Sequence, residues 1–164
     1  MPISLTIVSS MYMTRLKDPN ASSGYDRYEY FSSRLSYCNQ VIVARKFSPK
    51  FSAQLAPAIV HYNQAENFTD NNDSYHLAAA IRYKVSNRIA ITAEYSYTLR
   101  ENTQQEVYNP LGIGVDIETG GHVFQLFVTN AFGITENQFL PYTYSSWSDK
   151  GFRIGFNVSR VFSL

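Results

Sequence analysis

The chain has 164 residues and a formal net charge of +1, and only 16% of its residues are charged. That length suits one domain, and the near-neutral charge gives no reason to expect nucleic acid as a partner. A charged fraction well below the roughly 25% of soluble domains favours a protein that places its many tyrosines at a membrane interface or in a β-rich core.

The N-terminal residues bear on export. Met1 to Thr6 contain no basic segment and no continuous apolar stretch, so they are not expected to be a signal peptide. No run approaches the roughly 18 apolar residues of a membrane-spanning helix. Two alternatives stay open: the chain is a fragment whose export signal lies upstream, or the interpretation as a membrane barrel is wrong.

Apolar and polar residues alternate with a period of two along most of the chain, which predicts strands rather than helices. The first predicted strand covers residues 3–13. After a polar loop, a long second strand runs from about 27 to 47, and a three-residue turn leads to a third at about 51–60. Pro57 predicts a bulge or a local break in this third strand.

The clearest pair of strands covers about 75–84 and 89–99, joined by the short turn 85–88. A polar loop precedes two further strands at about 111–118 and 123–129, which Gly120-Gly121 joins as a tight hairpin signal. A long loop, about 130–150, then leads to a last strand near 152–162. These are eight predicted strands in one domain over residues 1–164.

The predicted connections alternate between long and short. Long polar ones fall near 14–26, 63–74, 101–109 and 130–150, and short ones near 48–50, 85–88 and 119–121. A transmembrane barrel has this asymmetry because its short turns face the periplasm and its long loops face outward. We therefore predict an all-β, antiparallel up-and-down transmembrane β-barrel in the bacterial outer membrane, either with its eight strands alone or as a fragment of a larger barrel.

Charged residues are sorted onto one face of the predicted strands. In a transmembrane barrel this face points to the lumen, since a lipid-facing Arg or Lys at the midplane costs roughly 2–4 kcal/mol. A soluble lipocalin-like barrel that binds an apolar ligand predicts the same alternation with the faces reversed, and it remains the alternative. The predicted lumen-facing polar network comprises Arg34, Gln40, Lys46, Arg82, Glu94, Arg100, Asp116, Glu118 and Arg153.

Aromatic residues lie toward the strand ends, where transmembrane barrels carry interface girdles. The predicted girdle residues are Tyr12, Phe31, Phe47, Phe51, Tyr75, Tyr83, Tyr95, Tyr97 and Phe162.

Several stretches resemble a known family. They are the run from Tyr108 to Leu111, the run Gly114-Val115-Asp116-Ile117-Glu118-Thr119-Gly120-Gly121-His122-Val123-Phe124-Gln125-Leu126, the ending Arg153 to Phe162, and Gln40 to Phe47 upstream. Together they are similar to an uncharacterised β-barrel family of the Bacteroidota. The resemblance implies an outer-membrane barrel without an assigned function, whose members are longer and begin with an export signal. It brings no catalytic residues.

Catalytic and metal chemistry find little support. Asp116 and Glu118 share one face and Arg153 could reach them, which favours an ion-pair network over a catalytic pair. The histidines lie on separate strands without metal-ligand spacing, although His61 and His76 flank one loop and could approach each other. We expect no enzyme activity, no cofactor and no metal, and a structural or passive-transport, porin-like role with outer-membrane lipid and a small polar solute as partners.

Eight strands that close on themselves would leave an interior filled by side chains, and a larger barrel would leave a narrow polar channel.

Overall fold

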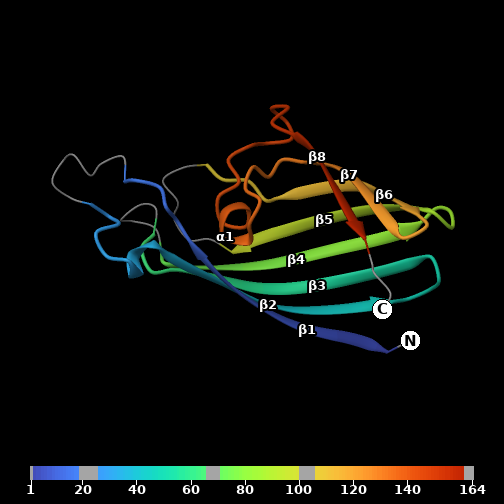
Figure 1. The fold of residues 1–164 in the computed structure, drawn as a ribbon, viewed down its shortest axis with the longest axis horizontal. Coiled ribbons are helices and arrows are strands. Elements are labelled where there is room, and N and C mark those ends of the chain that lie inside the picture. Colours follow the sequence, from blue (N-terminus) through green and yellow to red (C-terminus); the bar gives the residue numbers. More distant parts are fainter. Residues whose placement is uncertain (1, 19–25, 66–70, 100–105, 161–164) are drawn as a thin grey trace.

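The computed structural model describes residues 2–18, 26–65, 71–99 and 106–160. They form one antiparallel sheet of eight strands, in which each strand pairs with its neighbours in sequence (Figure 1). The predicted all-β, up-and-down architecture is confirmed. The strands are β1 (Ile3–Met13), β2 (Leu35–Lys46), β3 (Phe51–Tyr62), β4 (Asp73–Lys84), β5 (Ile89–Leu99), β6 (Leu111–Thr119), β7 (His122–Thr129) and β8 (Arg153–Arg160).

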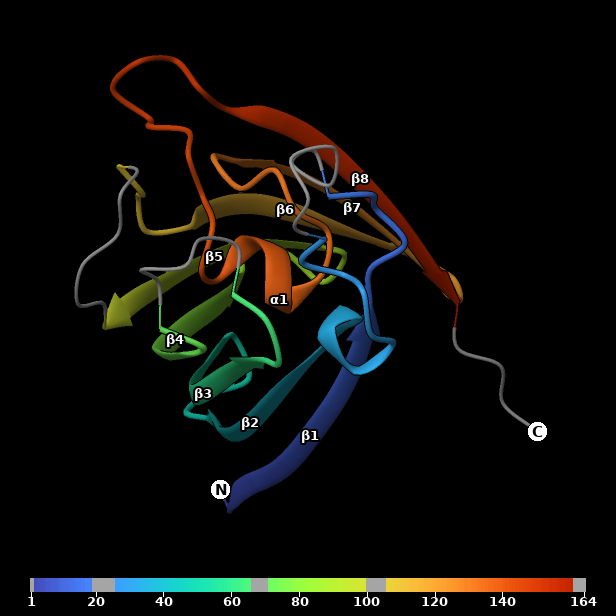
Figure 2. The same ribbon diagram turned by 90° about the vertical axis from the view of Figure 1, so that its left-hand side faces the viewer.

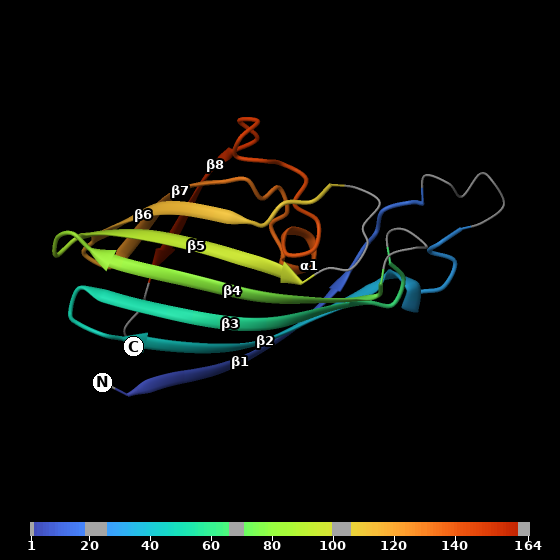
Figure 3. The same ribbon diagram turned by 180° about the vertical axis from the view of Figure 1, so that it is seen from behind.

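The sheet curves into an open half-barrel, seen from one end in Figure 2 and from behind in Figure 3. In the described residues, β1 pairs only with β2 and β8 only with β7. The short connections, at 47–50, 85–88 and 120–121, lie at one end of the sheet, and the longer ones at the other (Figure 1). We call these the short-turn end and the long-loop end. No helix in the described part of the chain is long and apolar enough to cross a membrane.

The second strand begins later than the alternation predicts. It starts at Leu35, and Ser32–Arg34 form a 3-10 helix instead. The preceding turn is set by Asp26, whose carboxylate accepts a hydrogen bond from the Tyr28 backbone N–H at 2.8 Å. Such side-chain bonds to the backbone compete with strand pairing.

Pro57 interrupts the ladder between β2 and β3 without shifting it. The register on both sides of the proline is the same, with Gln40 opposite Ala58 and Val43 opposite Leu55, and the two pairs between them are missing. Proline lacks the N–H that the ladder needs, so the predicted local break is confirmed and the predicted bulge is wrong.

The convex face of the sheet is apolar and accessible. Leu77, Ile91, Ile113 and Phe156 are 45%, 46%, 50% and 74% exposed. Soluble monomers rarely expose contiguous apolar patches above a few hundred Å². A row of such side chains on every strand therefore needs an apolar solvent, as the lipid-facing side of a membrane barrel does.

The concave face carries small and polar residues. Buried on this side are Ser36, Ala56, Ala58, His76, Ala90, Ser96 and Asp116. The interior of the sheet is thus the polar side, as the sorting of charges in the sequence predicts.

Aromatic rings gather at both ends of the convex face. Phe47 and Phe51 lie with ring centroids 5.6 Å apart at the short-turn end, and Tyr83 pairs with Phe51 across the ladder. Tyr75, Tyr95 and Tyr97 are exposed nearer the long-loop end. Two predicted girdle residues are placed differently: Phe31 lies in the turn before β2, and Tyr12 bonds to Glu136 on the concave side. Phe162 lies outside the described residues.

Candidate functional site

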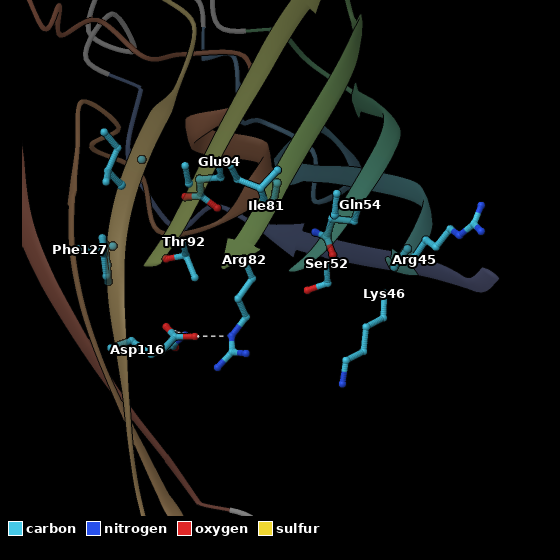
Figure 4. A pocket seen from close by; sticks show the side chains of 18 of the residues that line it. Arg45, Lys46, Ser52, Gln54, Ile81, Arg82, Thr92, Glu94, Asp116 and Phe127 are labelled. Atoms are coloured by element: carbon cyan, nitrogen blue, oxygen red, sulfur yellow. Dashed lines mark hydrogen bonds and ion pairs between the residues drawn. The ribbon is translucent and has the colours of Figure 1, made fainter. Parts of the chain in front are cut away.

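The concave face borders an open cavity of about 720 Å³ toward the short-turn end, lined by residues from all eight strands. Its polar lining includes Lys46, Gln54, Arg82, Glu94 and Asp116 (Figure 4). Polar groups from many strands therefore face one shared space.

Glycines on the inner face make room for larger side chains that line this cavity. An ideal Cβ on Gly112 would lie 2.8 Å from Glu94 Oε1, and one on Gly155 would lie 2.4 Å from Phe127 Cζ. Each glycine thus makes room for a larger side chain from the neighbouring strand. Gly112 and Gly114 are both strand residues with this packing role.

An ion-pair network spans β4 and β6 on the cavity side. Arg82 Nε donates to Asp116 Oδ2 at 2.9 Å, and Arg82 Nη2 donates to Glu118 Oε1 at 2.7 Å. Lys84 Nζ lies 3.5 Å from Glu118 Oε1, and Gln125 Nε2 donates to Asp116 Oδ1 at 3.0 Å. Both carboxylates are therefore neutralised by cations of a strand two positions away.

The connection between β7 and β8 folds back into the curve of the sheet. It contains the short helix α1 (Glu136–Phe139), which lies inside the half-barrel at the long-loop end (Figure 2). Tyr12 donates to Glu136, Tyr62 donates to the backbone oxygen of Asn137, and Asn137 Nδ2 donates to Ser36 Oγ at 3.0 Å. These contacts hold α1 against β1, β2 and β3.

A small apolar cluster lies beneath this infolded connection. Leu140 is 3% exposed and packs with Cys38, Ala58 and Val60. Thr98 Oγ1 donates to the Leu140 backbone oxygen at 3.0 Å. The connection therefore covers the concave face at the long-loop end, while the cavity lies toward the short-turn end.

A model of the family described as "Membrane bound beta barrel domain (DUF5777)" matches residues 1–162. The chain belongs to this family. The resemblance to an uncharacterised membrane β-barrel family is thereby confirmed, and its placement in the Bacteroidota stays a prediction. No significant match to the chain was found among curated proteins or among solved structures.

Within this membrane-bound β-barrel domain, the predicted polar network divides into separate groups. Arg82, Glu94, Asp116 and Glu118 come from adjacent strands of the cavity wall, and Lys46 lines the cavity at the end of β2. Gln40 lies deeper toward the long-loop end, where its Nε2 donates to Cys38 Sγ at 3.6 Å.

Arg34 and Arg153 lie away from the cavity. Arg34 belongs to the 3-10 helix before β2 and donates to the Leu16 backbone oxygen at 3.1 Å. Arg153 donates to Ser145 Oγ at 3.0 Å, so its predicted contact with Asp116 and Glu118 is wrong. The reason is its position at the long-loop end, opposite Thr129 in the ladder. Arg100 lies outside the described residues.

The histidines that flank one loop point to opposite faces of the barrel domain. His61 Nδ1 lies 2.7 Å from Asp73 Oδ1 on the convex side, and His76 is buried on the concave side between Ser74 and Thr98. The two rings do not approach each other, because β3 and β4 pair in a register that places His61 opposite Asp73 and His76 opposite Ala58. No cluster of three or more metal-ligating side chains occurs in the described ranges.

Sequence reasoning missed the residues that fasten the infolded connection. Asn130 is 1% exposed and donates to the Ser145 backbone oxygen at 2.9 Å and to the Asn109 backbone oxygen at 3.1 Å. The available signal was the apolar content of the loop, because Phe139 and Leu140 are unusual in a connection that stays in water.

Proposed function

We propose that this membrane-bound β-barrel domain lies in the bacterial outer membrane and provides a passive, porin-like route for small polar solutes. The observation that carries the proposal is the polar cavity on the concave side of a sheet whose convex side is apolar. In a barrel this arrangement places hydrogen-bonding groups along the lumen and aliphatic groups against lipid.

The dimensions of the strands support the membrane position. β1 to β5 contain 11 or 12 residues each, and a tilted strand needs about 9–11 to cross the hydrocarbon core. Outer-membrane barrels have short periplasmic turns and longer outer loops. We therefore assign the short-turn end to the periplasmic side.

The outer edges of β1 and β8, which have no strand partner among the described residues, bear on the size of the barrel. In lipid every backbone polar group must be satisfied, so an open edge cannot remain. The cavity between these strands supports the alternative in which they form part of a larger barrel with a narrow polar channel. The partner of each edge would be another strand of the protein or of a second copy.

The other roles considered have less support. A lipocalin-like barrel would need its apolar faces inside, and here they lie outside. A catalytic pair of carboxylates would need at least one group available to a substrate, and Asp116 and Glu118 are both bound to Arg82. We therefore propose a non-enzymatic role with lipid and a small polar solute as partners.

The test compares two neighbouring alanines of β4. Ala80 lines the cavity, and Ala79 points to the convex side. In the full-length protein reconstituted into liposomes, Ala80→Trp should reduce sugar-driven swelling several-fold because the ring fills the lumen. Ala79→Trp should leave swelling unchanged because its ring faces lipid. Equal swelling of both variants, or no swelling with the unchanged protein, would refute the proposed route.

A further inference from the structure

Glu94 is a carboxylate at the centre of a membrane-spanning strand. It is the middle residue of β5, and its side chain faces the cavity (Figure 4). Ionisable groups at this depth are costly, and they commonly pair with an opposite charge or mark an ion or solute pathway. In the part of the chain that the structure describes, Glu94 has no hydrogen-bond or ion-pair partner.

The neighbours of Glu94 leave its carboxylate accessible. Its partners across the ladder are Ala80 on β4 and Gly112 on β6. A Cβ on Gly112 would lie 2.8 Å from Glu94 Oε1, so any larger residue there would displace the carboxylate. Ser96, two residues further on the same face, is 4% exposed, and its hydroxyl is unpartnered among the described residues. The site thus offers an accessible carboxylate beside the cavity, whereas the unpartnered Ser96 hydroxyl is buried outside the cavity lining.

The cations nearest to Glu94 are engaged elsewhere or lie further away. Arg82 is on the adjacent strand, but its Nε and Nη2 are bonded to Asp116 and Glu118. Lys46 lies on β2, separated from β5 by two strands, and thus about 14 Å away along the sheet at a spacing of ~4.8 Å per strand. The negative charge of Glu94 is therefore directed at the lumen.

We propose that Glu94 binds a monovalent cation, either an alkali ion or the ammonium group of a solute, and that it makes the lumen prefer cations. Divalent ions need more ligands than this, since Ca²⁺ takes about 6–8 oxygens. The cation preference rests on the proposed function, whereas binding at Glu94 does not require passage.

The first experiment measures ion selectivity. With the full-length protein in a planar bilayer under a KCl gradient, the reversal potential should show that K⁺ permeates more readily than Cl⁻. Glu94→Gln should lower the ratio of K⁺ to Cl⁻ permeability by about fivefold or more, because it removes a negative charge that lies close to the passing ions. Glu94→Lys should make the lumen favour Cl⁻. Glu106→Gln, which removes an exposed carboxylate outside the strands, is the matched control. A ratio that Glu94→Gln leaves unchanged overturns the proposed selectivity.

The second experiment measures binding without passage. A water-soluble carbodiimide should modify Glu94 in the folded protein, and mass spectrometry of the digested chain locates the product. Methylammonium chloride and KCl should each slow this modification, and glucose should not. If neither salt protects Glu94 more than glucose does, the binding site is refuted. Protection in a protein that does not conduct would uphold the site and refute only the proposed route.

Discussion

Ala79 and Ala80 are neighbours near the middle of β4 that point to opposite faces of the sheet. Replacing each of them with arginine should therefore change the free energy of folding by very different amounts. Ala79→Arg places a charge at the midplane of the lipid-facing surface, which costs roughly 2–4 kcal/mol in transmembrane barrels. Ala80→Arg places the same charge in the cavity opposite Glu94. A partly solvated ion pair changes the free energy of folding by no more than about 1 kcal/mol.

The expected difference in the free energy of folding is therefore about 2 kcal/mol, which is roughly thirtyfold in the equilibrium constant. The assay is reversible folding of the full-length protein into phospholipid vesicles, titrated with guanidinium chloride. Trp147, the single tryptophan in the sequence, reports folding by fluorescence. An equal cost for the two variants, or a larger cost for Ala80→Arg, would refute the assignment of the two faces.

Three further predictions concern side chains on the inner face of the sheet. Arg82→Met should lower the free energy of unfolding by about 1–3 kcal/mol because it leaves Asp116, whose side chain is 7% exposed, without its cation. Adding Asp116→Asn to the same protein should restore part of this stability in the vesicle titration. No restored stability would contradict the ion pair. Gly155→Ala should lower the melting temperature because its Cβ would meet the Phe127 ring. Adding Phe127→Ala should restore part of the lost melting temperature. An unchanged melting temperature for Gly155→Ala alone would contradict this packing. Cys38 is 0% exposed and should resist a water-soluble maleimide until the protein unfolds, so rapid labelling of the folded protein would argue against its burial.

The strands could be predicted from the sequence because alternation with a period of two depends only on neighbouring residues. Leu77, Ala79 and Ile81 face one side and Ala78 and Ala80 the other, as the pattern indicates. The start of β2 could not be predicted in this way, because a hydrogen bond from the Tyr28 N–H to Asp26 ends the alternating pattern locally.

The candidate site was only partly predictable. Placing Asp116 and Glu118 on one inner face required periodicity alone, but finding Arg82 as their partner required the stagger between β4 and β6. The alternation alone also allowed Arg153 as a partner, which the register places at the other end of the barrel. Residues 130–152 follow no periodic pattern, so the position of α1 inside the curve of the sheet depends on long-range contacts such as that of Leu140 with Cys38.

The direction in which β4 presents its side chains can be measured by spin labelling. In a Cys38→Ser background, single cysteines at positions 77–81 would each carry a nitroxide in the full-length protein in lipid vesicles, with accessibility to oxygen and to a water-soluble nickel complex compared at each site. Oxygen should reach positions 77, 79 and 81 most readily, and the nickel complex should reach 78 and 80. The opposite alternation, with nickel favouring 77, 79 and 81, would contradict a barrel whose apolar side faces lipid and whose polar side lines the interior.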